Sequence, residues 1–470
     1  MLIVGAGVVG TAIARTLAQY DLSCVIVDAG NDVGTGTSKA NTAVLHTGFD
    51  AVPGSLEGRL VSRGSALLRR YADEAGIPIE RTGALLIAWN SDQQAELPAI
   101  ADKAHRNGYR AVRPVTAAEI YGLEPHLGPG ALGALEIPDE GIICPWTTPL
   151  AFATEAVGAG VRLLLMTRVT GVRPGRGRVA EACHEVLTTT GTLRCRWLVN
   201  AAGLGSDTID HMLGGDGFTI RPRRGELIVF DKLARPLLGH ILLPVPTAAT
   251  KGVLVAPTVY GNVLLGPTAQ DIADRTDTAT TTDGLASLLA DGRRIMPDLV
   301  AEEITATYAG LRAATDHRDY QIGVDGRRRY VCVAGIRSTG LTASLGIAEY
   351  VAQQMESEGL TLRPSKRAGP PPRMPYIGDA GVRPYQDAAR IASDPAYGEI
   401  VCHCERVTLG ELRDALSSTI PPADAEGLRR RTRARSGRCQ GFYCGAAVAE
   451  LLAGARTRVR DPKPMTGCPT

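Results

Sequence analysis

The stretch MLIVGAGVVGTAIARTLAQYDLSCVIVDAG (residues 1–30) has the pattern of a strand, a glycine-rich turn, a helix and a second strand. Gly5, Gly7 and Gly10 form a G-x-G-x-x-G motif, and Asp28 closes the second strand about 20 residues later. The glycines permit a tight turn and let backbone N–H groups at a helix N-terminus approach a pyrophosphate, while Asp28 would accept hydrogen bonds from a ribose. The stretch therefore predicts a Rossmann-like unit that binds a dinucleotide, and it leaves open whether this is NAD or FAD.

The composition sets broad limits on the rest of the chain. Its 470 residues can hold two or three domains, and a formal net charge of +2 gives no reason to expect nucleic acid as a partner. No apolar run approaches the ~18 residues needed to cross a bilayer, and no basic segment precedes the apolar start, so we expect neither a membrane span nor a signal peptide. Six of the ten cysteines are scattered without a pairing pattern, which favours a cytoplasmic protein with reduced thiols.

Beyond the opening unit, the pattern changes along the chain. Helices and strands alternate between residues 60 and 200, and β-rich stretches separated by Gly and Pro follow between 220 and 265, which indicates an antiparallel sheet. The strand YVCVAG (330–335) then leads through a glycine-containing turn into the helix LTASLGIAEYVAQQM (341–355). Seven prolines without a periodic pattern over 363–396 predict a linker.

Three further stretches carry a family resemblance: GTGTSKANTAVLHTGFD (34–50), VNAAGLGSD (199–207) and GIRSTGLTAS (335–344). Together with the first turn, they resemble the D-amino-acid-oxidase-like flavoproteins. Within these the chain is most similar to FAD-dependent glycerol-3-phosphate dehydrogenases and oxidases, with L-2-hydroxyglutarate oxidases as cousins. The resemblance implies FAD in an extended form, with its ADP half on the first glycine-rich turn. Where this chain has Asp28 the family more often has glutamate, and the shorter side chain keeps the same role.

The resemblance also implies which residues line the cofactor. Ser38 and Asn41 match positions near the pyrophosphate and the ribityl chain, and Ala202 and Gly203 match a turn that wraps around the cofactor. A later turn precedes a helix whose N-terminus faces the isoalloxazine ring, where the helix dipole favours the anionic reduced flavin. Beyond the first turn and Asp28, the cofactor-binding residues expected are Ser38, Asn41, Thr47, Ala202, Gly203, Gly335, Gly340 and Thr342.

Oxidation of an alcohol by such an enzyme needs a group that takes the hydroxyl proton and cations that hold an anionic substrate. His46 is the candidate base, because the resemblance places its loop beside the flavin and an imidazole titrates near neutral pH. The alternative is that His46 only packs on the ring. Arg312 and Lys251 match positions that hold the substrate in the glycerol-3-phosphate-oxidising proteins, and Arg337 and Arg224 are further cationic candidates.

Four cysteines lie in two tight pairs near the C-terminus, Cys402-x-Cys404 and Cys439-x4-Cys444. Taken alone, they are compatible with a structural zinc site or with two disulfides, although reduced cytoplasmic thiols disfavour the latter. The segments IVCHCERVTLGELRDAL and GRCQGFYC that contain them resemble the bacterioferritin-associated-ferredoxin-like (BFD-like) domain. That resemblance implies a 2Fe–2S cluster with the four cysteines as its ligands.

An arginine-rich run, GLRRRTRARSGR (427–438), lies directly before the second cysteine pair. It is either a solvated helix face or a set of six cations with a function. In the second case the arginines offset the charge of an anionic cluster and tune its potential, or they dock an acidic partner.

The predicted fold class is α/β plus α+β. A Rossmann-like FAD-binding domain carries an inserted antiparallel-sheet substrate domain, and a small helical cluster-binding domain follows. The expected parts are an FAD-dependent oxidoreductase over 1–358 (FAD-binding about 1–85, 150–210 and 328–358), a Pro-rich linker over 359–398, a BFD-like domain over 399–454 and a tail over 455–470.

A flavin joined to a one-electron cluster favours a dehydrogenase over an oxidase that reduces oxygen. The resemblance is then to the catalytic subunit of the anaerobic-type glycerol-3-phosphate dehydrogenases. It implies oxidation of sn-glycerol 3-phosphate to dihydroxyacetone phosphate and transfer of electrons to a second flavoprotein or another acceptor subunit, with association at the inner membrane face through a partner. The alternatives are a dehydrogenase of an L-2-hydroxy acid or another polyol phosphate, and a subunit that only relays electrons.

Overall fold

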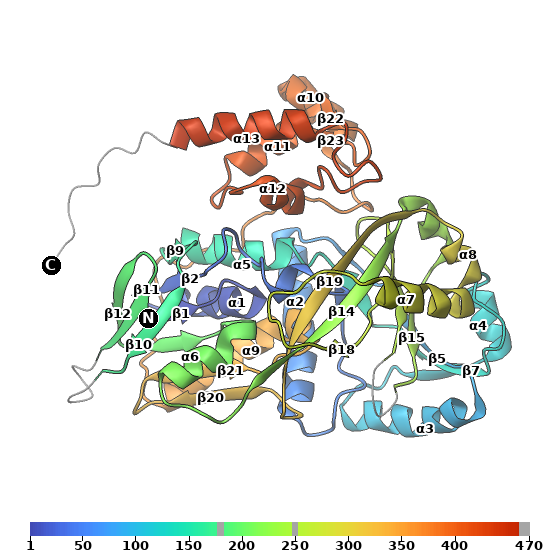
Figure 1. Ribbon diagram of the computed structural model, residues 1–470, viewed down its shortest axis with the longest axis horizontal. Helices are drawn as coiled ribbons and strands as arrows, with labels where there is room; N and C mark the ends of the chain where they lie inside the picture. The colour runs from blue at the N-terminus through green and yellow to red at the C-terminus, as the bar shows by residue number, and fades with distance from the viewer. Residues whose placement is uncertain (176–182, 247–251, 460–470) are drawn as a thin grey trace. The chain divides into compact units, whose positions relative to one another are not determined.

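The computed structural model describes residues 1–175, 183–246 and 252–459 (Figure 1). The chain divides into two compact units, Met1–Ala380 and Gly381–Thr470. The linker expected over 359–398 spans the division between these two units. Its second half belongs to the C-terminal unit and forms three short helices, η4 (Pro384–Gln386), α10 (Ala388–Ser393) and η5 (Pro395–Tyr397).

A six-stranded sheet forms the centre of the first unit. In spatial order its strands are β20 (Gln321–Asp325), β21 (Tyr330–Ala334), β13 (Leu198–Asn200), β1 (Leu2–Val4), β2 (Val25–Val27) and β9 (Arg162–Leu164). All neighbours are parallel except β20 and β21, which pair antiparallel. These strands are short and mostly apolar, as expected for a parallel sheet that helices cover. The Rossmann-like unit predicted from residues 1–30 is confirmed.

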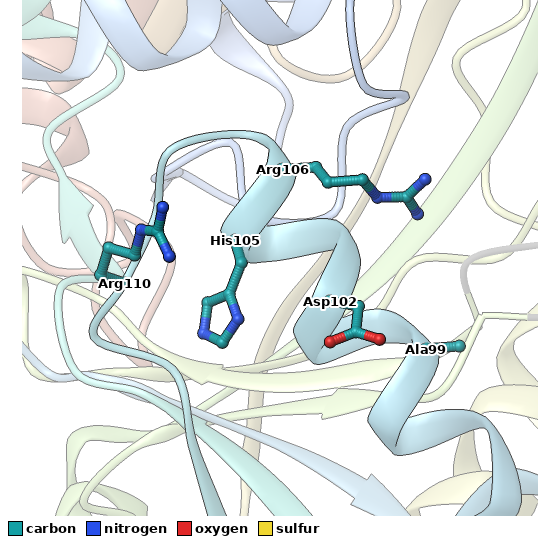
Figure 2. A pocket seen from close by; sticks show the side chains of 5 residues that line it. All are labelled: Ala99, Asp102, His105, Arg106 and Arg110. Carbon is teal, nitrogen blue, oxygen red and sulfur yellow. The ribbon is translucent and has the colours of Figure 1, made fainter.

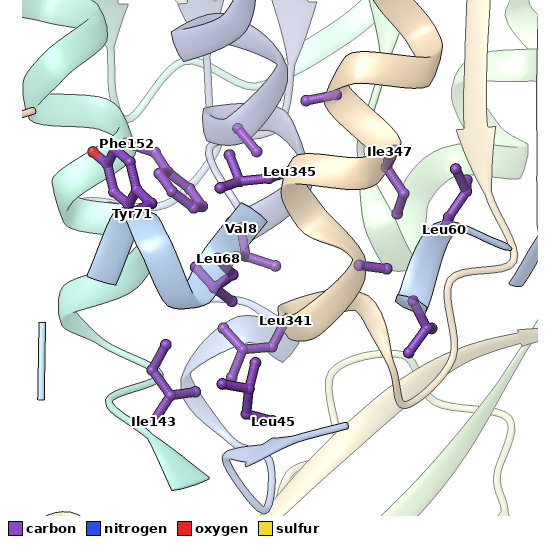
Figure 3. Close-up of a cluster of buried hydrophobic side chains, with 14 of the residues drawn as sticks. Val8, Leu45, Leu60, Leu68, Tyr71, Ile143, Phe152, Leu341, Leu345 and Ile347 are labelled. Carbon is purple, nitrogen blue, oxygen red and sulfur yellow. The ribbon is translucent and has the colours of Figure 1, made fainter. Parts of the chain in front are cut away.

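Four helices pack together beside this sheet: α1 (Val8–Leu17), α2 (Leu56–Ala75), α5 (Thr147–Gly158) and α9 (Gly340–Ser357). Leu68 of α2, Phe152 of α5 and Leu345 of α9 belong to one buried apolar cluster (Figure 3). Helices α2 and α9 approach very closely, since a Cβ on Gly64 would lie 2.4 Å from the carbonyl oxygen of Thr342. This contact fixes the first turn of α9, which the sequence assigns to the flavin.

The second layer of the first unit is a nine-stranded sheet. Its strands follow the spatial order β18 (Gln270–Asp271), β14 (Ile220–Phe230), β17 (Val263–Gly266), β16 (Leu254–Pro257), β15 (Ile241–Pro244), β5 (Ala84–Ala88), β7 (Gly133–Ile137) and β6 (Arg113–Thr116), and β19 (Ile304–Thr315) also pairs with β14. The long β14–β19 pair is antiparallel throughout, with Ile220 opposite Thr315. The predicted antiparallel sheet is confirmed, although β15 and β5 pair parallel within it.

Two smaller sheets complete this unit. The first is β3 (Val44–Leu45), β8 (Gly141–Ile143) and β4 (Ile79–Glu80), and the second is β10 (Val169–Arg173), β11 (His184–Thr188) and β12 (Gly191–Cys195). In the first, Leu45 pairs with Gly141, so that the residue after Leu45 lies across from the residue before Gly141. The remaining helices are η1 (Thr37–Lys39), α3 (Ser91–Arg106), α4 (Ala117–Leu123), η2 (Gly203–Gly205), α6 (Ser206–Met212), η3 (Lys232–Leu237), α7 (Thr282–Ile295) and α8 (Pro297–Val300).

The C-terminal unit combines a two-stranded sheet with small helices. These elements are β22 (Ile400–Cys402), β23 (Val407–Thr408), α11 (Leu409–Leu416), α12 (Ala425–Thr432) and α13 (Gly445–Val459). A capping box starts α11, because Thr408 accepts a hydrogen bond from the backbone of Glu411 and the Glu411 side chain accepts one in return. Across the described part of both units, no helix is long and apolar enough to span a membrane.

Candidate functional site

The turn between β1 and α1 is built for close backbone contact. A Cβ on Gly10 would lie 2.0 Å from the carbonyl oxygen of Gly5, so only glycine fits there. Gly7 is the N-cap of α1 and, as a glycine, brings no side chain to cap this helix end. The positive end of the helix dipole and the first-turn N–H groups therefore point towards the place where a pyrophosphate would lie.

Asp28 lies directly behind this turn at the end of β2. Its Oδ2 accepts a hydrogen bond from the Ala6 N–H at 2.6 Å, and its Oδ1 accepts one from the Gly30 N–H at 2.7 Å. A carboxylate can accept about four hydrogen bonds, so this side chain shapes the turn and keeps acceptor capacity for ribose hydroxyls. The ribose contact itself stays a prediction.

The loop around η1 meets the same helix end. The Ser38 hydroxyl accepts a hydrogen bond from the Val8 N–H at 2.9 Å, so it lies at the N-terminus of α1, and its contact with a pyrophosphate stays a prediction. Asn41 instead braces the loop, since its Nδ2 donates to the Ser38 carbonyl and its Oδ1 accepts from the Ala43 N–H. The Tyr308 hydroxyl of β19 donates to the Asn41 carbonyl at 2.7 Å.

A second glycine-containing turn lies against the first. A Cβ on Gly5 would lie 2.4 Å from the carbonyl oxygen of Ala201, so that the turn of Ala202 and Gly203 at the end of β13 is adjacent to the first turn. Gly335 has a φ of +66° and begins the segment that leads into α9 at Gly340. The structure thus gathers the predicted cofactor-binding turns at the ends of β1, β13 and β21.

His46 lies between two of these elements. Its backbone N–H donates to the Thr342 hydroxyl at 3.0 Å, which links the end of β3 to the first turn of α9. Its Nδ1 lies 3.1 Å from Oε2 of Glu140, a carboxylate with no solvent exposure. Oε1 of Glu140 accepts hydrogen bonds from both the Thr47 N–H at 2.6 Å and the Thr47 hydroxyl at 2.9 Å. Glu140 is not among the site residues predicted from the sequence.

Glu140 carries no signal in its own sequence context. It follows β7 in a short turn, 94 residues from His46, and belongs to no motif. The β3–β8 register sets the contact, because Leu45 pairs with Gly141. The contact between Glu140 and His46 could therefore be predicted only from the pairing of these two strands.

The predicted substrate cations differ in their surroundings. Arg312 is half-buried on β19, and among the described residues its guanidinium hydrogen-bonds the Thr268 carbonyl at 3.4 Å. Burial and the nearby Arg223 lower the pKa of its guanidinium, and no carboxylate in the described part of the chain opposes this. A Cβ on Gly225 would lie 2.9 Å from this guanidinium, so glycine makes room for it.

The other predicted substrate cations give less support for a role in holding an anionic substrate. Arg224 is only 5% exposed, and its guanidinium binds Asp277 at 3.0 Å and Gln270 at 2.5 Å, so these two side chains already engage it. Arg337 donates to the His317 carbonyl, and its buried Nε has no hydrogen-bond partner among the described residues. Lys251 lies outside the described residues.

The four C-terminal cysteines come together two by two. Cys402 neighbours Cys444, and Cys404 neighbours Cys439, with all four thiols free of disulfides. The Tyr443 N–H and the Cys404 thiol, and after them the Gly441 and Phe442 N–H groups, hold the pKa of the Cys439 thiol below its usual range, whereas burial raises the pKa of Cys402 to about 11.

Within the described ranges, no three His, Cys, Asp or Glu side chains surround a single metal position. Two pairs of thiols suit the two irons of a 2Fe–2S cluster better than a single tetrahedral zinc, which would gather all four sulfurs around one point. Backbone N–H groups directed at a sulfur are also a usual way to stabilise such a cluster. The donor set therefore fits the group that the sequence predicted.

The arginine-rich run is not a solvated helix face. Arg430, Arg431 and Arg433 are each less than 9% exposed, because the chain folds back over them. Arg431 donates to the carbonyls of Ile420 and Gly427, and Arg433 forms a buried ion pair with Glu405 at 3.1 Å. Three of the six arginines are thus buried within the small unit, and Arg433 reaches Glu405, the residue after Cys404.

The first unit also has a surface hollow of about 850 Å³ (Figure 2). It is lined by Ala99, Asp102, His105, Arg106 and Arg110, most of them on α3. Its lining contains no predicted cofactor or substrate residue, and we assign no function to it.

The fold and both sites define a flavoprotein oxidoreductase with an iron–sulfur domain. The family model for FAD dependent oxidoreductases matches residues 1–354, and the model for the BFD-like [2Fe-2S] binding domain matches residues 400–454. The chain belongs to the FAD-dependent oxidoreductase family, and its cofactors are FAD and a 2Fe–2S cluster. The family and cofactor predictions are thereby confirmed.

Individual relatives show which flavoprotein oxidoreductases this chain is similar to. The chain is 33% identical over 454 residues to glycerol 3-phosphate dehydrogenase of Caloramator mitchellensis, covering 96% of this chain and 93% of that protein. It is 26% identical over 501 residues to one subunit of the anaerobic glycerol-3-phosphate dehydrogenase of Escherichia coli K12, covering 96% and 87%. A solved structure of FAD-bound L-alpha-glycerophosphate oxidase from Mycoplasma pneumoniae has a TM-score of 0.74 at 27% identity, covering 80% and 98%.

Proposed function

We propose that this chain is a dehydrogenase that oxidises sn-glycerol 3-phosphate to dihydroxyacetone phosphate and passes the electrons on through its 2Fe–2S cluster. The relatives named glycerol 3-phosphate dehydrogenase support this substrate, and they match nearly the whole chain, including the cluster domain. An oxidase needs no such domain, so its presence supports a protein acceptor rather than oxygen.

The observation that carries the proposal is that the guanidinium of Arg312 has no carboxylate partner in the described part of the chain. A half-buried guanidinium costs free energy when no anion neutralises it, and no carboxylate of the described chain does so. Thr37, the residue before Ser38, donates its hydroxyl to the Leu311 carbonyl at 2.8 Å, so Arg312 is adjacent to the cofactor-side loop. A phosphate ester bound by this fork would supply the missing charge.

The remaining chemistry falls to His46. Bound FAD supplies a hydride acceptor for C2 of the substrate, and the cluster supplies one-electron transfer. When the hydride leaves C2, the hydroxyl must lose a proton, and the imidazole of His46 accepts it. Arg312 and Lys251 hold the phosphate during this step, and Arg337 is a further cation near the flavin.

The direct test is an anaerobic reductive titration. Purified protein with both cofactors is mixed with sn-glycerol 3-phosphate while the visible absorbance of the flavin is followed. Rapid bleaching is the expected result, with no bleaching by the mirror-image sn-glycerol 1-phosphate. Bleaching by an L-2-hydroxy acid instead would show that the substrate belongs to that class. A flavin that no small alcohol reduces would support a subunit that only relays electrons.

The proposal extends to a partner. A relative whose name designates it a subunit suggests that this chain also works with an acceptor protein, such as a second flavoprotein, and reaches a membrane only through it. Phe442 and Tyr443, between two cluster cysteines, are 84% and 73% exposed, so the cluster loop is accessible to a partner.

A further inference from the structure

Glu140 is a buried carboxylate that the proposed reaction has not yet used. It has no solvent exposure, and three hydrogen-bonding groups of the His46–Thr47 loop converge on it. A buried carboxylate is costly unless such donors satisfy it, so its presence in this turn calls for a reason. The contact with His46 provides one.

The hydrogen bonds fix the protonation pattern of the pair. An ionised carboxylate has only acceptors, so the neutral imidazole must carry its proton on Nδ1 to bond Oε2 of Glu140. The lone pair of a neutral imidazole is then on Nε2, which is the nitrogen that can accept a proton. The Thr47 N–H and hydroxyl both bind Oε1, so they hold the carboxylate in place and leave Oε2 to the imidazole.

The turn that holds Glu140 also has a cationic neighbour. Burial, and after it the nearby Arg81, lower the pKa of the Arg69 guanidinium on α2, while Glu140 and Asp139 act on it in the opposite direction. The Tyr109 hydroxyl donates a hydrogen bond to Asp139 at 3.1 Å and interacts electrostatically with Glu140. Arg69 also donates a hydrogen bond to the Asp139 carbonyl, so a cationic side chain lies beside the turn that carries Glu140.

We infer that Glu140 is the positioning residue for the base: it holds His46 in the Nδ1–H tautomer and stabilises the imidazolium that forms when Nε2 takes the substrate's hydroxyl proton. The inference rests on the proposed function, in which His46 is the base. In the step itself, the substrate C–H bond breaks and its electron pair goes with the hydrogen to the flavin. The O–H bond also breaks, its proton forms a bond to Nε2, and the C–O bond becomes a carbonyl. Glu140 gives up no atom and takes none.

The test compares Glu140→Gln with a matched control in the full-length protein with both cofactors bound. The amide keeps the size of the side chain but brings N–H groups towards Nδ1, which disfavours the required tautomer. Glu124→Gln is the control, because Glu124 is 1% exposed and its Oε1 binds Nδ1 of His240 at 2.7 Å in a different loop. Flavin content and the visible spectrum report whether each variant is intact.

Two measurements distinguish a Glu140 that positions His46 from a Glu140 that only packs against it. The rate of anaerobic flavin bleaching by sn-glycerol 3-phosphate should fall about 10²- to 10⁴-fold in Glu140→Gln, the usual range for loss of acid–base catalysis, and stay within about threefold of wild type in Glu124→Gln. The imidazole pKa of His46, followed by NMR without substrate, should fall in Glu140→Gln because the stabilising negative charge is gone. In a His46→Gln background, Glu140→Gln should cause no further loss of rate.

The outcomes separate this inference from the proposed function. If wild type is not bleached by sn-glycerol 3-phosphate, the proposed substrate fails, while the His46 pKa still tests Glu140. A Glu140→Gln protein with the wild-type rate, or with an unchanged His46 pKa, overturns the inference. Should this variant lose FAD, Glu140→Asp takes its place: it keeps the charge, so the His46 pKa should stay above that of a His46 with no carboxylate neighbour, and an ordinary value would refute the role.

Discussion

Replacing Arg312 by methionine tests the assignment of the substrate cation most directly. The side chain loses its charge and changes little in length, so the change removes one anion contact and little volume. Truncating one partner of a desolvated charge pair costs about 2–5 kcal/mol, and because Arg312 is only half-buried we take the lower part, about 2–3 kcal/mol. That corresponds to a loss of about 30- to 150-fold in kcat/KM at about 1.4 kcal/mol per factor of ten.

The same substitution should not destabilise the fold. The described part of the chain offers Arg312 no carboxylate, and burial already lowers the pKa of the guanidinium, so the wild-type protein gains little by keeping it charged. We expect the free energy of unfolding to stay within about 1 kcal/mol of wild type or to rise, as often happens when a functional charge is removed. The assays are stopped-flow flavin reduction and urea unfolding of the FAD-loaded protein.

Arg224→Met supplies the contrast on the neighbouring strand. Arg224 is deeply buried and paired with Asp277 and Gln270, so its loss should cost about 1–3 kcal/mol of stability. Its effect on kcat/KM per bound FAD should be smaller than that of Arg312→Met. The reasoning is refuted if Arg312→Met keeps kcat/KM close to that of wild type, or if it destabilises the protein as much as Arg224→Met does.

Three further predictions follow from contacts elsewhere. Cys439→Ser should abolish the absorbance and EPR signals of the 2Fe–2S cluster while leaving substrate bleaching of the flavin intact; loss of bleaching as well would mean that the two sites are not separable. Gly10→Val should yield protein without bound FAD, because its Cβ would lie 2.0 Å from the Gly5 carbonyl oxygen, and a yellow, stable variant would contradict the turn geometry. For Asp207, burial raises the pKa, but the Arg275 hydrogen bonds and the Ile220 N–H outweigh it and the net shift is downward. A carboxylate with a lowered pKa in the folded state stabilises the protein at pH values above its unfolded pKa of about 4. At pH 7 the free energy of unfolding of wild type should therefore exceed that of Arg275→Met by roughly 1–2 kcal/mol. In urea unfolding repeated from pH 4 downward, this difference should become smaller.

Local patterns predicted the parts of this molecule that depend on local geometry. The turn of Gly5, Gly7 and Gly10 is visible in sequence because a strand, a tight turn and a helix must follow one another there, and α1 begins at Val8 as that order requires. The two cysteine pairs are also visible in sequence, although their spacing alone left zinc or disulfides open and the resemblance to the BFD-like domain supplied the 2Fe–2S cluster.

Contacts between distant segments were not predictable in the same way. Glu140 meets His46 only because β3 pairs with β8 in one particular register, and nothing near either residue indicates that pairing. Arg312 and Arg224 look alike in sequence, yet the first has no carboxylate neighbour among the described residues and the second is engaged by Asp277 from a later loop. Burial of Arg433 beside Glu405 likewise depends on tertiary folding of the small unit.

The short turn between β7 and β8 has a consequence for how this protein can change in length. Surface turns usually tolerate an inserted or deleted residue, and they are the first places where related sequences differ in size. This turn carries the carboxylate that faces His46, and a shift of one position would put Asp139 or Gly141 in its place. Residues 138–140 join the nine-stranded sheet to the β3–β8–β4 sheet, so protein engineers who lengthen or shorten loops should keep their number fixed.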